Sequence, residues 1–412
     1  MRRTVRAIVS APVVAAVAFG SLLAAPAANA ANNTITVWVD QKRIDNYRDV
    51  FSSGTYAGYK INLVPKDFGK IRDDLTTVSE ASAPDVITGA HDWTGALAAN
   101  GLIVKLNVPK ATIKALSPYA LSGFRYGTGI YGIPTQIENV AMITNAKLVP
   151  KQPKTWNDLE TIALSLKKKG KVTVPFAVPQ GANGDAYHMY PLFSGLGGYV
   201  FGTNKSGSVN VKDVGLDNKT FRQNQALINT WNANGLINSK VDYGIAKDAF
   251  TSGKSPFWIT GPWELEAIKA LPFKYRVTAV PPIVAGIKPV PFLGAQGAMV
   301  TKYAAEHGVQ TGANALVTQF MAGADYQAKL AAADGRTPAN LVAQKRVSEP
   351  VLKAFSAAGV GGVPMPNVPQ MASVWGALGG AWVNSTKGKG AMPAQKSFAQ
   401  AQSTVKKAIA AG

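Results

Sequence analysis

Residues 248–269 read DAFTSGKSPFWITGPWELEAIK, in which an apolar run is followed by a Gly-Pro turn and a tryptophan. Phe257–Ile259 has the length and composition of a short buried strand. Thr260–Pro262 suits the entry of a helix, and the two glutamates that follow complement the positive end of its dipole. Trp263 is therefore expected on a rigid turn between strand and helix, where a flat ring can face a cleft and bind the apolar face of a sugar.

The pattern Ala-Phe-x-x-Gly-Lys at 249–254 precedes this strand. Together, these features resemble the extracellular solute-binding proteins of ABC-type importers, and the maltose/maltodextrin-binding branch in particular. Pro-Asp-strand-Ala-His-Asp at 84–92, Gly-Ile-Pro at 132–134 and Pro-Asn-x-Pro-Gln-Met at 366–371 extend the resemblance over nearly all of the chain after residue 30.

The resemblance implies an α/β fold of the periplasmic-binding-protein type. Two α/β lobes are joined by a three-segment hinge, and the ligand lies in the cleft between them. We expect the N-terminal lobe to comprise 31–136 plus 293–336, and the C-terminal lobe 137–292 plus 337–412. In open α/β sheets ligands bind at the carboxyl ends of the strands, and a hinge of a few residues allows closure by small dihedral changes.

Residues 1–30 have the pattern of a secretory signal peptide, with three early arginines, an apolar run at 7–25 and an Ala-Asn-Ala cleavage motif at 28–30. That motif and the polar Asn32-Asn33 favour secretion over the alternative, a single membrane anchor. The sequence contains no cysteine, which excludes disulfides, thiolate catalysis and cysteine-rich zinc sites. The cysteine that carries a lipid anchor in many Gram-positive members of the resembled family is therefore missing too. We expect a periplasmic or extracellular protein without that anchor.

The chain carries a formal net charge of +20 at pH 7, which becomes +17 when the three arginines of residues 1–30 are removed. Such an excess raises the alternative of a module that binds polyanions, with an affinity that falls steeply as salt is added. The lysines are scattered, however. The only run of three, Lys167–Lys169, falls at the end of a predicted helix, where cations suit the dipole. We therefore expect no nucleic-acid partner.

The resemblance also implies which side chains bind the ligand. Aromatic rings would stack on sugar rings, while carboxylates and a basic pair at the end of the first strand would bind hydroxyls through charge-assisted hydrogen bonds. The candidates are Lys42, Arg43, Asp92, Trp93, Glu138, Asp185, Tyr187, Trp263 and Trp375. An ordinary charged loop remains the alternative for the basic pair, and a salt bridge in the hinge remains the alternative for Glu138.

Three glycines depart from the resembled pattern. Gly89 stands where the maltodextrin-binding proteins have a stacking tryptophan, and Gly376 and Gly379 stand where they have a tyrosine and an arginine. Either Trp93 supplies the missing stacking surface from another direction, or that subsite is lost. Reduced bulk at three places points to a wider or differently shaped ligand, such as a longer or branched glucan.

The implied function is that of the substrate-binding component of an ABC sugar importer. It captures malto-oligosaccharides or maltodextrins outside the cytoplasmic membrane and delivers them to the permease subunits. The resemblance implies no catalytic residue, no cofactor and a monomer, and three histidines without a neighbouring ligand set argue against a metal site. Alternatives are the same fold binding another oligosaccharide or an acidic sugar, and a secreted glycoside hydrolase. A hydrolase would need two carboxylates about 5 or about 6.5–9.5 Å apart, and no signature of such a pair is present.

Overall fold

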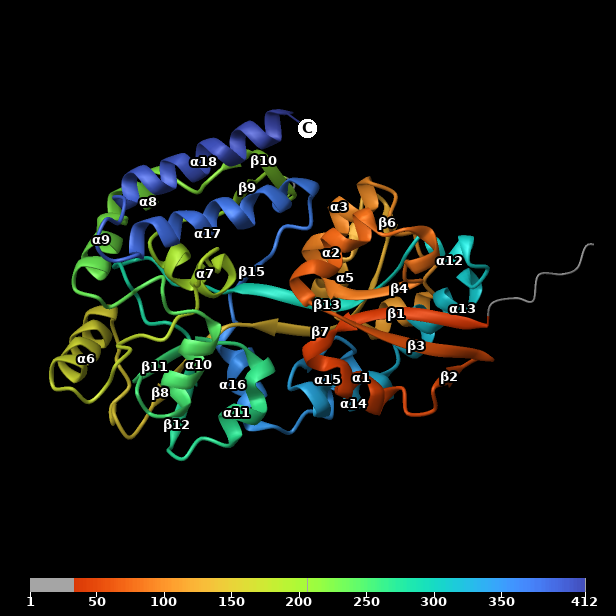
Figure 1. Cartoon of the computed structure of the whole chain (residues 1–412), viewed down its shortest axis with the longest axis horizontal. Helices are drawn as coiled ribbons and strands as arrows, with labels where there is room; N and C mark the ends of the chain where they lie inside the picture. The colour runs from red at the N-terminus through yellow and green to blue at the C-terminus, as the bar shows by residue number, and fades with distance from the viewer. Residues whose placement is uncertain (1–32, 206, 412) are drawn as a thin grey trace, which may run out of the picture.

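The computed structural model describes residues 33–205 and 207–411, so the predicted signal peptide lies outside the described residues. Figure 1 shows two α/β halves side by side, with strands β7 (Ile133–Asn139) and β13 (Phe292–Val300) running through the middle of the molecule. The α/β class predicted from the sequence is confirmed.

The other strands are β1 (Thr34–Asp40), β2 (Thr55–Tyr56), β3 (Tyr59–Lys66), β4 (Val86–Ala90), β5 (Arg125–Tyr126), β6 (Gly129–Ile130), β8 (Ala141–Asn145), β9 (Phe201–Thr203), β10 (Val209–Val214), β11 (Phe257–Thr260), β12 (Tyr275–Thr278), β14 (Thr337–Pro338) and β15 (Val363–Pro364). The α-helices are α1 (Ile44–Val50), α2 (Phe68–Thr77), α3 (Thr94–Ala99), α4 (Lys110–Ala115), α5 (Pro118–Gly123), α6 (Trp156–Lys168), α7 (Ala186–Gly195), α8 (Lys219–Asn224), α9 (Ala226–Ala233), α10 (Tyr243–Thr251), α11 (Leu265–Lys269), α12 (Tyr303–Glu306), α13 (Gln310–Ala315), α14 (Ala324–Asp334), α15 (Leu341–Lys345), α16 (Pro350–Ala358), α17 (Ala372–Thr386) and α18 (Ala394–Ala411). Short 3-10 turns are η1 (Gln41–Arg43), η2 (Glu80–Ser82), η3 (His91–Trp93), η4 (Pro262–Glu264) and η6 (Pro369–Met371), and η5 (Leu316–Phe320) is a π-helix. Within the described ranges, no helix is both long and apolar enough to cross a membrane.

The first half is built on a sheet with the strand order β14-β7-β13-β4-β1-β3-β2, and β15 pairs with β13. Strand β1 pairs in parallel with β3 and β4, whereas β13 runs antiparallel to both β4 and β7. The carboxyl ends of β1, β3 and β4 therefore lie at the same edge of the sheet, and the loops that follow them are close together.

Alternate side chains of β1 serve two cores, one on each face of this sheet. Ile35, Val37 and Val39 pack with α1 and α14, whereas Trp38 packs with α2 and α3. Figure 1 shows these two pairs of helices on opposite faces of the sheet. A strand covered on both faces must be apolar at nearly every position, which explains the run Ile-Thr-Val-Trp-Val at 35–39.

The second half contains a three-stranded antiparallel sheet in the order β11-β8-β12. Only Val140 separates β7 from β8, so the chain passes directly from the large sheet into the small one. Along β8, Met142 faces one core and Ile143 the other. Trp156, predicted to be a packing residue at the start of a helix, is 3% exposed and lies in the first of these cores, which confirms the prediction.

The strand, turn and helix predicted within residues 248–269 are also present, as β11, η4 and α11. Gly261 lies at the turn between β11 and η4, and a Cβ atom at this position would lie 2.1 Å from the ring of Trp263. The ring can therefore lie directly against the backbone only because residue 261 is a glycine.

Candidate functional site

A cavity of about 1010 Å³ lies between the two halves, and all nine candidate residues line it. The loops after β1 and β4 contribute Lys42, Arg43, Asp92 and Trp93, and β7 contributes Glu138; the second half contributes Asp185, Tyr187, Trp263 and Trp375. The sequence thus identified side chains that the fold brings together from positions more than 300 residues apart.

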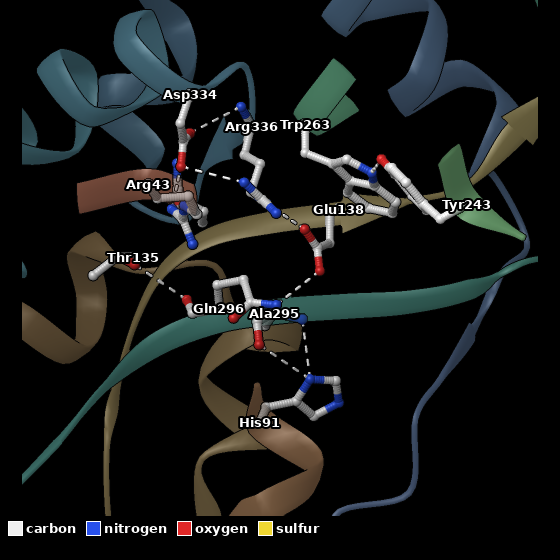
Figure 2. A network of polar contacts seen from close by, with 11 residues as sticks. Arg43, His91, Thr135, Glu138, Tyr243, Trp263, Ala295, Gln296, Asp334 and Arg336 are labelled. Atoms are coloured by element: carbon white, nitrogen blue, oxygen red, sulfur yellow. Dashed lines mark hydrogen bonds and ion pairs between the residues drawn. The ribbon is translucent and has the colours of Figure 1, made fainter. Parts of the chain in front are cut away.

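A chain of buried charges forms part of the cavity wall (Figure 2). Arg43 pairs with Asp334, whose carboxylate also accepts a hydrogen bond from Arg336 Nη1 at 3.3 Å. Arg336 Nε donates to Glu138, and the other oxygen of Glu138 accepts from Gln296 Nε2 at 2.9 Å. Burial alone would lower the pKa of Arg43, but Asp334, Tyr47, Glu138 and Asp40 together outweigh this effect, so the pKa lies above the ordinary value and the guanidinium stays charged.

These contacts bear on two of the candidates. Glu138 forms the salt bridge that the sequence analysis left open as its alternative role, and it also lines the cavity. Arg43 is likewise held by Asp334, with its side chain 7% exposed. Only those atoms of Glu138 and Arg43 that do not take part in these internal bonds are available to contact a ligand.

Trp263 is fixed by polar and aromatic neighbours as well as by Gly261. Its Nε1 donates to the hydroxyl of Tyr243 at 2.7 Å (Figure 2), and that hydroxyl donates to Glu264. Burial and the Glu264 carboxylate both raise the pKa of Tyr243, so the phenol stays protonated and can donate. The guanidinium of Arg336 lies 5.4 Å from the centre of the Trp263 ring, a cation–π distance.

Asp92 and Trp375 connect the two halves across the cavity. Trp375 Nε1 donates to Asp92 Oδ2 at 3.0 Å, and the Asp92 residue is 6% exposed. Burial raises the pKa of Asp92 above its ordinary value. One oxygen of this predicted hydroxyl acceptor is therefore already occupied by a predicted stacking residue.

Asp185 caps the N-terminus of α7, where its carboxylate accepts from the backbone N–H of His188 at 3.0 Å and lies 2.6 Å from His188 Nδ1. Burial would raise the pKa of Asp185, but the charge and hydrogen bonds of His188 outweigh it and lower the pKa. Lys42, by contrast, is exposed, and its Nζ lies 5.6 Å from the centre of the Tyr243 ring.

The structure corrects the expectation that three glycines widen the site. A Cβ atom at Gly89 would lie 2.1 Å from the Trp93 ring, so this ring occupies the space that a side chain at 89 would need. At Gly379 the space is taken by the backbone of Asn183, 2.9 Å from the ideal Cβ position. Only Gly376 of the three has open space around it. Two of the three missing side chains are therefore replaced by other atoms, and the cavity gains no room there.

Several cavity residues were missed by the sequence analysis. They are Phe68, Arg72, His188, Tyr243, Gln296, Asp334 and Arg336. Arg336 stood within a predicted crossing, which was a signal for its position but not for its contacts. Within the described part of the chain, four buried polar atoms on cavity-lining side chains have no hydrogen-bond partner: Arg43 Nε, Tyr187 Oη, His188 Nε2 and Gln296 Oε1. Unpaired buried polar groups are costly, and a polar ligand that reached these atoms would remove that cost.

The cavity differs from the rest of the chain in charge. Eight Asp or Glu side chains and five Lys or Arg side chains line it, whereas the whole chain has 23 acidic and 43 basic residues. The basic excess is therefore located outside the cavity. Among the described residues, no group of three or more His, Cys, Asp or Glu side chains is arranged to hold a metal ion.

An α/β protein with a cavity between two halves, lined by aromatic and charged side chains, has the features of a solute-binding protein. Residues 46–357 match the family described as bacterial extracellular solute-binding protein, and the chain belongs to this family. The resemblance noted from the sequence is thus confirmed. The family and the relatives below are solute-binding proteins and not enzymes.

Over most of its length, the chain is similar to curated relatives whose names include a sugar. It is 29% identical over 315 residues to the maltodextrin-binding protein MdxE of Bacillus subtilis (strain 168), covering 71% of this chain and 70% of the relative. It is 27% identical over 358 residues to a maltooligosaccharide ABC transporter solute-binding lipoprotein of Streptococcus pneumoniae (strain ATCC BAA-255 / R6), covering 83% and 81%. It is 25% identical over 280 residues to the galactooligosaccharide-binding protein of Bacillus subtilis (strain 168), and the match spans 65% of each chain.

Proposed function

We propose that the protein is the substrate-binding component of an ABC sugar importer. It captures malto-oligosaccharides outside the cytoplasmic membrane and delivers them to the membrane permease. The observation that carries this proposal is the convergence of three aromatic side chains, Tyr187, Trp263 and Trp375, on one cavity that also holds unpaired buried polar atoms. Flat rings bind the apolar faces of sugars, and the charged and polar side chains that line the cavity supply partners for hydroxyls.

The two halves would act as lobes, 31–136 plus 293–336 and 137–292 plus 337–412, joined by a three-segment hinge. The direct passage from β7 into β8 and the central position of β13 support this division. Closure of the lobes around the sugar would create the surface that the permease recognises, and the protein would act as a monomer.

The volume of the cavity and the names of the relatives favour an oligosaccharide over a single sugar. About 1010 Å³ lies at the upper end of the range of about 300–1,000 Å³ that is typical of small-molecule sites. Maltodextrin and maltooligosaccharide occur in the names of two relatives, which supports an α-glucan. The name galactooligosaccharide-binding protein supports a second candidate ligand, a galactose-containing oligosaccharide.

An acidic sugar is disfavoured by the charge of the cavity. Carboxylates outnumber basic side chains there by eight to five, and the basic residues Arg43 and Arg336 are already paired with Asp334 and Glu138. A uronate would add negative charge to a wall that already has an excess of it, which is unfavourable at close range. The same argument disfavours binding of a polyanion inside this cavity.

A thermal-shift panel tests the proposal. It would compare maltose, maltotriose, longer malto-oligosaccharides, a galacto-oligosaccharide and an oligouronate. A ligand at about 100 times its Kd should stabilise the protein by about 2.7 kcal/mol. We expect the largest shift with a malto-oligosaccharide, retention of the shift in Trp263→Phe, which keeps a flat ring, and its loss in Trp263→Ala. A shift with the oligouronate alone would refute the proposed substrate.

A further inference from the structure

At the cavity wall near Gly89, the more exposed aromatic side chain is Phe68 and not Trp93. The Trp93 ring lies against the backbone of Gly89 and is only 7% exposed. The Phe68 ring lies 5.0 Å from it between ring centres, at an interplanar angle of 39°. Phe68 is itself only partly buried and lines the cavity. Trp93 therefore packs against Phe68, and most of its own surface is covered.

Phe68 is held in a fixed position by the start of a helix. It is the first residue of α2, directly after the N-cap Asp67, whose carboxylate accepts from the backbone N–H of Gly69 at 2.9 Å. This cap follows the carboxyl end of β3, so the ring is tied to the large sheet at the edge where ligands of such sheets bind. The cap fixes the backbone at Phe68 and the contact with Trp93 limits the motion of its ring, so little conformational entropy is lost when a ligand packs on it.

Polar side chains accompany this ring on the same wall. Arg72 lies four residues after Phe68 and hence on the same face of α2, and both line the cavity. The Arg72 side chain is 26% exposed and is oriented by a hydrogen bond from its Nε to Asp73 at 2.8 Å. Asp67 also lines the cavity. An aromatic ring, a guanidinium and a carboxylate are thus presented together, and we call Asp67, Phe68 and Arg72 the Phe68 wall.

We propose that the Phe68 wall is a subsite for an additional neutral hexose unit of an oligosaccharide, and that Phe68 is the ring that stacks on it. This inference rests on the proposed function. Tyr187, Trp263 and Trp375 belong to the other half of the protein, and among the described residues no ring contact joins any of them to Phe68. A ligand that contacts both sets of rings must therefore reach beyond the rings of one half. Phe68 would then determine the preference for chain length, because only a longer ligand reaches it.

Calorimetric Kd values for maltose, maltotriose and maltotetraose test this inference. In the wild type, affinity should rise with length. In Phe68→Ala the affinity for the longest ligand should fall by about fivefold, the effect of one aromatic contact, while the affinity for maltose stays the same. Phe68→Tyr should retain the wild-type pattern. Phe68→Leu keeps Trp93 covered but lacks a flat face, and it should behave like Phe68→Ala.

The outcomes separate this inference from the proposed function. If the wild type binds the oligosaccharides and Trp263→Ala does not, but Phe68→Ala and Phe68→Leu match the wild type at every length, the subsite is refuted and the function stands. Equal weakening at every length would also refute the subsite. If the wild type binds none of the oligosaccharides, both the proposed function and the subsite are refuted. Melting of each variant without ligand identifies any loss of folding.

Discussion

The role of the buried charges is best tested at Asp334, because two arginines share its carboxylate. Its side chain is 2% exposed, and those of Arg43 and Arg336 are 7% and 9% exposed. Asp334→Asn keeps the shape of the side chain but removes the negative charge. Arg336 still pairs with Glu138. Arg43, however, has no other ion pair among the described residues, so its buried charge is left without an ion-pair partner.

The size of the expected loss of stability follows from this one unpaired arginine. Removal of one partner of a buried ion pair costs about 3–5 kcal/mol, because the remaining charge stays out of water without a counter-charge. We expect Asp334→Asn to lower the free energy of unfolding by about this amount. Urea unfolding followed by circular dichroism measures it, with the midpoint and the slope compared between variant and wild type.

Asp325→Asn provides a matched control. Asp325 lies on the same helix, α14, and pairs with Arg346 at 2.6 Å, but the two side chains are 89% and 50% exposed. Exposed pairs contribute little because water screens them, so we expect no measurable change in this control. A loss of stability below about 1 kcal/mol in Asp334→Asn would refute the reasoning, because the arginines would then be compensated by water or by other groups.

Three further predictions concern stability. Burial lowers the pKa of His91 below 6.5, so as the pH falls the unfolded chain takes up a proton before the folded chain does, and stability falls below pH 6.5. Between about pH 7 and about pH 5, urea unfolding should therefore show a smaller loss of the free energy of unfolding for His91→Gln than for the wild type. Gly89→Ala should cost about 1–3 kcal/mol by overpacking against Trp93, and in a Trp93→Ala background the same change should cost much less, which a double-mutant cycle measures. Thr155→Ala removes the cap in which Thr155 accepts from the Asp158 N–H at 3.2 Å, and it should lower the urea-derived free energy of unfolding by about 1 kcal/mol; an unchanged midpoint would contradict it.

The sequence predicted those features that depend on neighbours along the chain. The strand, turn and helix of 248–269 and the buried start of α6 at Trp156 follow from local apolar patterns and helix caps, and both are present. The candidate residues were found through motifs, and all of them line one cavity. Whether they bind a ligand stays a prediction, as do the lobe boundaries.

Contacts between distant segments could not be predicted in this way. The bond between Arg336 and Glu138 joins residues 198 positions apart, and no local pattern indicates which acid a buried arginine will meet. The space around a glycine is also not predicted by local patterns. The missing bulk at Gly89 reads as a gap in the sequence, yet the Trp93 ring fills it, because the direction of a side chain four residues later depends on the turn between them.

The position of the buried charges also limits where the proposed hinge can bend. Glu138 lies on β7, Gln296 on β13 and Arg336 just before β14, so hydrogen bonds of one carboxylate connect all three segments of the proposed hinge. The same strands are joined by backbone pairing, since β7 pairs with both β13 and β14. A rotation within this region would break the pairing and leave buried charges without partners, which is far more costly than a change of a few backbone dihedrals. We therefore expect the bending points of the proposed hinge beyond these paired strands, as at Val140 between β7 and β8.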